Sequence, residues 1–204
     1  MYRSATALVL GLSFVALPIA AQMPKTPPGT PDIGGVTAGS YTVDPNHSQV
    51  SFTVNHLGFS TYRGLFGGIT GSMTIDPKAP AKAKVSIDIP MSGITTTVAE
   101  LDEHLKKADF FDAAKYPAAH FESTSVRPSG KTARISGNLT IKGITKPVVL
   151  DAVFVGAGTM MGKRTIGFDA KTTIKRSDFG VSYGIPLVPD TVPLEIFVAF
   201  EKPE

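Results

Sequence analysis

The sequence contains no cysteine among its 204 residues. This absence excludes disulfide bonds, cysteine nucleophiles, thiolate metal sites and dithiol redox chemistry. Tryptophan is also absent. A chain of this length is long enough to bury a sizeable hydrophobic core, so it can fold in an oxidising compartment without a disulfide framework.

A large excess of charge is also missing, since 20 Lys and Arg stand against 17 Asp and Glu with no basic block. This balance excludes a nucleic-acid partner, which would require clustered basic residues. The one long apolar run covers 5–19, follows Arg3 and contains Gly11 and Pro18. It is too short for a membrane-spanning helix of about 20 residues. We therefore predict a signal peptide over 1–21, no membrane span, and a periplasmic or secreted mature protein.

Residues 22–39 are rich in Pro and Gly and have no apolar periodicity. This composition is typical of a flexible tether. The folded domain is therefore predicted to cover 40–204. Internal repeats are absent from the sequence, so a single domain is expected.

The rest of the chain is dominated by apolar residues that alternate with polar ones. A period of two predicts strands with one buried face. Alternation is clearest at 49–55, 84–90, 133–141, 165–174 and 192–201, and weaker at 41–43, 64–75, 120–126 and 147–155. The short connections require antiparallel pairing. We predict an all-β fold, a barrel or a sandwich.

One long interruption, 91–116, separates these strands, and its segment 98–107 has helical character. It carries Asp102, Glu103 and His104, an acidic and imidazole cluster suited to metal binding or acid–base catalysis, with His120 as a further candidate. However, helical spacing places neighbouring residues on different faces. The same charges would serve equally well as the solvated face of a short helix that covers the barrel.

The inward faces of the predicted strands carry Val, Ile, Leu and Phe. Barrels of about eight strands are either filled by such side chains or hold one small ligand, and periodicity does not distinguish the two. If a cavity exists, its lining is predicted from the strand alternation and from the apolar side of the interruption: Phe52, Val54, Leu101, Leu105, Phe110, Phe111, Ile135, Leu139, Phe168, Ile196 and Val198.

Four segments together resemble the YceI-like family of bacterial polyisoprenoid-binding proteins. They are YTVDPNHSQVSFTVNHLGFSTYRGLFGGITGSMTID, LDEHLKKADFFDAAKYPAAHFES, ISGNLTIKGITKPVVL and GFDAKTTIKRSDFGVS, in the family's order. The resemblance implies a lipocalin-like antiparallel barrel around a long isoprenoid lipid or quinone-type tail, with a helix near the barrel mouth. It also implies a homodimer and export to the periplasm.

The resemblance further points to polar residues at the mouth, where a ligand head group would lie. The family's Asp-x-His-Leu motif falls on Asp102, His104 and Leu105, and its Arg-Ser-Asp-Phe-Gly motif begins at Arg176 and includes Asp178. Arg176 and Asp178 would equally suit a structural ion pair that closes a turn. For His104 we favour a structural role at the contact between helix and barrel.

The sequence therefore predicts a non-catalytic protein that binds, stores or transports a long-chain amphiphile and has no cofactor beyond that lipid. Two alternatives remain open. One is a metal-dependent or acid–base enzyme that uses Asp102, Glu103 and His104. The other is a solid barrel that acts as a stress-response interaction module.

Overall fold

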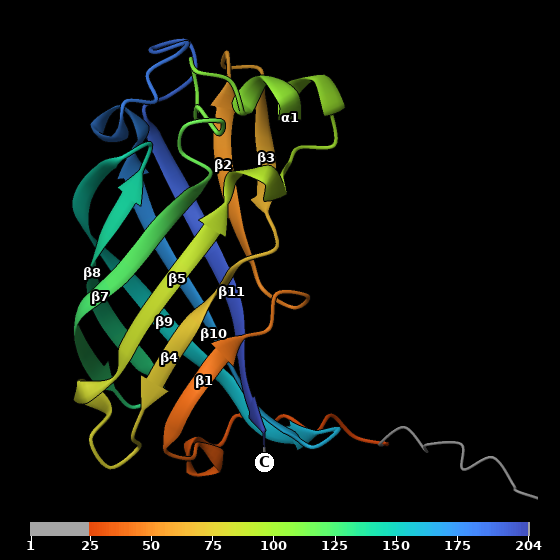
Figure 1. Cartoon of the computed structure of the whole chain (residues 1–204), viewed down its shortest axis with the longest axis vertical. Coiled ribbons are helices and arrows are strands. Elements are labelled where there is room, and N and C mark those ends of the chain that lie inside the picture. Colours follow the sequence, from red (N-terminus) through yellow and green to blue (C-terminus); the bar gives the residue numbers. More distant parts are fainter. Residues whose placement is uncertain (1–24, 204) are drawn as a thin grey trace, which may run out of the picture.

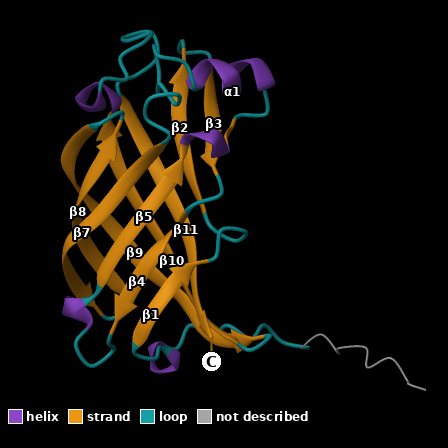
Figure 2. Ribbon diagram, in the orientation of Figure 1, coloured by secondary structure: helices purple, strands orange, loops and turns teal. Residues whose placement is uncertain are grey.

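The alternating stretches of the sequence form strands that wrap around a common interior (Figures 1 and 2). The residues buried by the fold are mainly apolar. The computed structural model describes residues 25–203, so the predicted signal peptide lies outside the described residues. The strands are β1 (Gly39–Val43), β2 (Gln49–His56), β3 (Ser60–Phe66), β4 (Thr70–Ile75), β5 (Lys84–Pro90), β6 (Ile94–Thr95), β7 (Ala118–Ser129), β8 (Thr132–Ile141), β9 (Ile144–Met160), β10 (Lys163–Lys175) and β11 (Thr191–Pro203). The helices are α1 (Ala99–Leu105) and the 3-10 turns η1 (Ile33–Gly35), η2 (Pro80–Lys82), η3 (Met91–Gly93) and η4 (Arg176–Phe179).

Eight strands close into a ring in the order β1-β4-β5-β7-β8-β9-β10-β11. Closure occurs where β11 pairs with β1, with Val43 opposite Phe200. All pairings are antiparallel. The predicted antiparallel barrel is therefore confirmed, and closure leaves these strands without free edges.

The other half of β11 pairs with β2, so that Leu194 lies opposite Phe52. β2 continues through β3 to β6. These three strands extend the wall toward the end of the barrel that carries α1, here called the upper end, whereas the C-terminus lies at the lower end (Figure 1).

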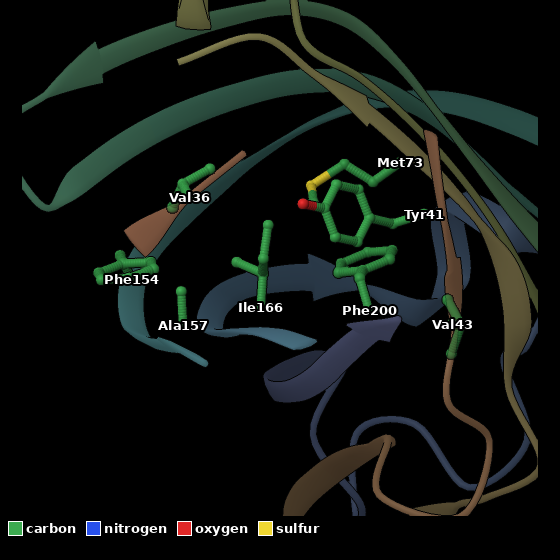
Figure 3. Packing of buried hydrophobic residues seen from close by; sticks show 8 residues of the cluster. All are labelled: Val36, Tyr41, Val43, Met73, Phe154, Ala157, Ile166 and Phe200. Carbon is green, nitrogen blue, oxygen red and sulfur yellow. The ribbon is translucent and has the colours of Figure 1, made fainter. Parts of the chain in front are cut away.

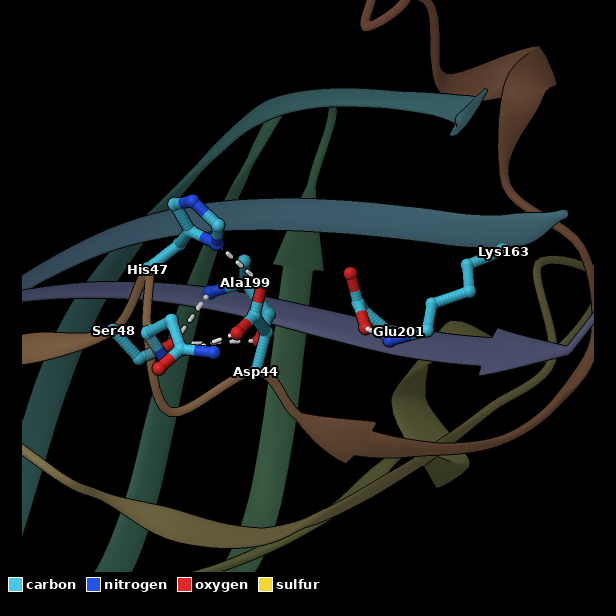
Figure 4. A network of polar contacts seen from close by, with 7 residues as sticks. Asp44, His47, Ser48, Lys163, Ala199 and Glu201 are labelled. Carbon is cyan, nitrogen blue, oxygen red and sulfur yellow. Dashed lines mark hydrogen bonds and ion pairs between the residues drawn. The ribbon is translucent and has the colours of Figure 1, made fainter. Parts of the chain in front are cut away.

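The break between β1 and β2 is held by polar contacts with β11 (Figure 4). The Asp44 N–H donates to the Ala199 carbonyl at 2.8 Å, and the Ala199 N–H donates to Ser48 Oγ at 3.0 Å. Burial alone would raise the pKa of the Asp44 carboxyl, but hydrogen bonds from His47 and from the Asn46 N–H hold that pKa below its ordinary value. The hydrogen bond with Asp44 also raises the pKa of His47. Polar groups thus replace the ladder bonds that the break removes.

The segment predicted to be a free tether contacts the barrel over part of its length. Thr30 exchanges two backbone hydrogen bonds of 3.0 Å with Ala157 in β9. Val36 is buried in a cluster with Tyr41, Ile166 and Phe200 (Figure 3). The packed part of the chain therefore begins before Ser40, because isolated apolar residues in this Pro- and Gly-rich stretch close the lower end of the barrel.

The single strand expected over 64–75 is instead two strands, β3 and β4, with β3 beginning at Ser60. They separate at 67–69, where the Gly67 N–H leaves the ladder and donates to the Gly93 carbonyl at 3.0 Å. The predicted helix at 98–107 forms as the shorter α1. Within residues 25–203, no helix has the length and apolar character needed to cross a membrane.

Candidate ligand-binding cavity

Side chains do not fill the barrel interior completely. A lower cavity of about 240 Å³ and an upper cavity of about 470 Å³ lie along the barrel. Val50, Ile89, Leu139 and Leu194 line both, so the cavities adjoin near the middle of the barrel. Of the two interiors that the sequence left open, the structure has the hollow one.

The lower cavity is walled almost entirely by apolar side chains on the inward faces of the strands. Ile135, Phe168, Ile196 and Val198 line it, as the strand alternation predicted. Ile33 and Val36 from the N-terminal segment, together with Pro77 and Pro80 from the β4–β5 connection, line it at the lower end. This surface offers contact to hydrocarbon and little hydrogen bonding.

The upper cavity is bounded on one side by strands and on the other by the segment that interrupts them. Phe52, Val54 and Leu139 face it from β2 and β8. Leu101 and Leu105 come from α1, and the turns after α1 contribute Phe110 and Phe111. The ring of Phe111 meets that of Phe66 edge to face, with centroids 5.6 Å apart. Packing of this kind holds α1 and the following turns as part of the cavity wall.

The lining of the upper cavity contains more polar side chains than that of the lower cavity. Most of these polar side chains form hydrogen bonds with neighbouring residues. The Tyr62 hydroxyl donates to the Thr96 carbonyl at 3.0 Å, and Thr96 Oγ1 donates to the Asp102 carboxylate at 2.6 Å. Asp102 therefore anchors the start of α1 to the segment that follows β6. Asp102 itself does not line the cavity, but it holds Thr96, which does.

Arg176 is buried beneath the loop that joins β10 to β11. Its guanidinium donates to the carbonyls of four residues at 2.8–3.0 Å: Val181, Tyr183, Val188 and Pro189. These bonds use four of the five N–H donors of an arginine. Burial lowers the pKa of Arg176. The side chain lines the cavity, but its hydrogen bonds organise the loop.

The carboxylate whose charge acts on Arg176 is that of Asp190, whose backbone carbonyl also accepts a hydrogen bond from the Arg176 N–H at 2.9 Å, and not that of Asp178, which the turn-closing alternative supposed. Asp190 accepts hydrogen bonds from the N–H and hydroxyl of Ser177 at 2.8 and 2.7 Å, which lower its pKa. Asp178 is exposed on η4. Sequence distance from Arg176 was therefore a poor guide, because the loop folds back and brings residue 190 next to 176.

His104 lies at the edge of the upper cavity and bonds within its own segment. Its Nε2 is 2.7 Å from Asp109 Oδ2, and this bond lowers the pKa of Asp109. The imidazole ring lies 5.0 Å from the Phe110 ring and 5.4 Å from Tyr183, and Phe110 and Tyr183 are also 5.0 Å apart. The three rings join α1 and its turns to the β10–β11 loop.

The cluster considered for metal or acid–base chemistry does not converge on one point. Asp102 bonds to Thr96, Glu103 to Lys106 and His104 to Asp109. His120 lies on β7 beside Asp88 at 2.8 Å. In the part of the chain that the structure describes, no three His, Asp or Glu side chains are grouped as a metal site would require.

Sequence reasoning missed several residues of the upper cavity, among them His56, Tyr62 and Tyr183. His56 continues the inward series of Phe52 and Val54, so the period of two was sufficient to find it. Tyr62 similarly alternates with Gly64 and Phe66. Tyr183 lies in a loop without periodicity, and only the tertiary structure brings it to His104.

Comparison with known proteins identifies relatives of this chain. The model of the YceI-like domain matches residues 41–200. Protein YceI of Escherichia coli O17:K52:H18 is 38% identical over 193 residues, covering 93% of this chain and 95% of the relative. The crystal structure of Burkholderia cenocepacia BcnA superposes with a TM-score of 0.68 at 26% identity, covering 77% of this chain and 98% of that one. A polyisoprenoid-binding domain from Saccharophagus degradans has the same fold at 15% identity, with a TM-score of 0.63 and coverage of 80% and 98%.

Proposed function

Because this chain belongs to the YceI-like family, we propose that it binds a long-chain amphiphile of the polyisoprenoid or isoprenoid-quinone type and does so without catalysing a reaction. The observation that carries the proposal is the pair of adjoining apolar cavities that share Val50, Ile89, Leu139 and Leu194. Their linear arrangement suits an extended chain better than a compact ligand. The Saccharophagus degradans neighbour is a polyisoprenoid-binding domain, which supports the same class of ligand.

The driving force is the transfer of hydrocarbon out of water, worth about 0.8 kcal/mol per CH₂ group. An apolar wall supplies this free energy without directional contacts, so selectivity depends on cavity length and on a few polar groups. We assign the apolar tail to the lower cavity. The head group lies at the upper end, near Tyr62, Thr96 and His104.

The ligand's head group then meets hydrogen-bonding groups and aromatic rings rather than a strong charge. Arg176 is committed to four carbonyls, and Asp178 is on the exposed side of η4. A neutral or weakly polar head group therefore fits this end better than a phosphate. Export to the periplasm, assembly as a homodimer and a role in lipid transport or storage belong to the same proposal.

The test is organic extraction of natively purified protein followed by mass spectrometry of the extract. We expect an isoprenoid lipid at a stoichiometry near one per chain. A matched extraction from the Ile196→Glu variant, which places a carboxylate on the lower cavity wall, should lose the lipid. The proposal is contradicted if the folded wild-type protein yields no lipid, both as purified and after incubation with isoprenoid alcohols.

A further inference from the structure

The upper end of the barrel carries exposed apolar side chains at the tips of two connections. In the β2–β3 hairpin, Phe59 is 89% exposed and Leu57 42% exposed. In the β10–β11 loop, Leu187 is 68% exposed and Tyr183 54% exposed. We call Leu57, Phe59, Tyr183, Ile185 and Leu187 the apolar rim.

The strand register brings the two tips together. β2 pairs with β11, and Leu194 lies opposite Phe52, so the end of β2 and the start of β11 are neighbours at the same end of the barrel. His56 precedes one tip, and Gly184 and Val188 flank the other. All three line the upper cavity. The apolar rim therefore stands beside the cavity mouth.

Both tips lack ionised side chains. The segments 54–62 and 179–189 contain no Asp, Glu, Lys or Arg. A surface that met only water would have no need to keep apolar residues in two uncharged loops. The chemistry of these tips instead matches a partner that is apolar and uncharged.

Both tips are also held in shape. The Gly58 N–H donates to Asn55 Oδ1 at 2.6 Å, and the Phe59 N–H to the His56 carbonyl at 3.0 Å. The guanidinium of Arg176 holds the Tyr183 and Val188 carbonyls, between which Ile185 and Leu187 project. Ordered loops present these side chains outward at little conformational cost.

We propose that the apolar rim inserts into the surface of a lipid bilayer, so that the cavity mouth opens onto the membrane. This inference rests on the proposed function, because an apolar chain that enters the cavity from a bilayer would otherwise have to cross water. Side chains that penetrate the headgroup region give that chain a continuous apolar path. The rim is uncharged, so the attraction is to hydrocarbon rather than to anionic headgroups.

The experiment is flotation of the full mature protein with neutral phosphatidylcholine vesicles. We expect wild-type protein to float with the vesicles, and the partition coefficient to be unchanged between roughly 0.1 M and 1 M salt, because salt screens charges and not apolar insertion. The F59S/L187S double variant should lose about ten-fold or more in partition. The matched control is Met161→Ser, a 91% exposed apolar residue in the β9–β10 hairpin at the lower end, which should partition as wild type.

The inference is overturned if wild-type protein does not float, if it floats only with anionic vesicles at low salt, or if the control loses as much partition as the double variant. Thermal unfolding of each variant checks that the fold persists. Native mass spectrometry with geranylgeraniol delivered from cyclodextrin separates this inference from the proposed function. The double variant should bind this probe like wild type. If neither protein binds it, ligand binding in the cavity is rejected, and the flotation result still tests whether the apolar rim inserts into a bilayer.

Discussion

Arg176 illustrates how little a residue's type reveals about its role. An arginine in a motif near a cavity mouth is a natural candidate for a head-group contact. Its guanidinium instead donates to four backbone carbonyls of a single loop, at distances of 2.8–3.0 Å. Buried carbonyls need donors, and a planar group with five N–H bonds can satisfy several at once.

We predict that Arg176→Met destabilises the protein by about 3–5 kcal/mol, because it leaves several buried carbonyls unpaired. Arg176→Lys should recover only part of this loss, since an ammonium cannot reach four carbonyls of fixed geometry. Urea unfolding measures both. The control is Arg134→Met, where the exposed ion pair with Asp151 is worth less than about 1 kcal/mol. A wild-type urea midpoint for Arg176→Met would contradict the structural role.

At the scale of elements, the segment between β6 and β7 works as part of the cavity wall. α1 has only seven residues, too short to be stable alone. Leu105 is buried in a hydrophobic cluster with Val50 and Phe66. Lys142 from the β8–β9 hairpin donates a hydrogen bond to the Ala108 carbonyl at 2.7 Å. Tertiary contacts therefore hold this helix in place.

A second feature at this scale is the pairing of β2 with β3, where Phe52 lies opposite Gly64. A Cβ at residue 64 would collide with the Phe52 ring, so glycine leaves the space that this ring occupies beside the cavity.

Gly64→Ala should therefore displace Phe52 and destabilise the protein by about 1–3 kcal/mol in urea unfolding. The control, Gly67→Ala, adds a Cβ that meets no atom within 4 Å and should be close to neutral. Combining Gly64→Ala with Phe52→Leu should restore part of the lost stability. Equal effects of the two glycine substitutions would argue against the steric explanation.

At the scale of the whole molecule, the register of the ring sets the length of the interior. Inward residues from β2, β5, β8 and β11 converge near mid-barrel, where Val50, Ile89, Leu139 and Leu194 line both cavities. This point controls whether one chain can occupy both.

Ile89→Phe should narrow the junction and shorten the longest isoprenoid that the barrel accepts. Binding of geraniol, farnesol and geranylgeraniol, measured by native mass spectrometry, should fall by about ten-fold or more for the longest alcohol and change little for the shortest. Ile135→Phe, on the lower cavity alone, provides the comparison and should affect only the chain end. Equal weakening of all three alcohols by Ile89→Phe would contradict a continuous binding path.

The sequence by itself determined most of the strands, their antiparallel pairing and many of the residues on their inward faces. A period of two is a local property, and it found Phe52, Ile135 and Phe168 without any knowledge of their partners. Short connections left a barrel or a sandwich, and the resemblance to the YceI-like family favoured the closed barrel that the structure has.

Only the tertiary structure decided that the interior is hollow, that Arg176 is occupied by carbonyls, and that Tyr183 meets His104. It also brought residues 30–36 against the lower end. The physical reason is the same in each case. Packing volume, satisfaction of buried carbonyls and loop contacts depend on residues far apart in sequence, and a local pattern contains no information about the distances between them.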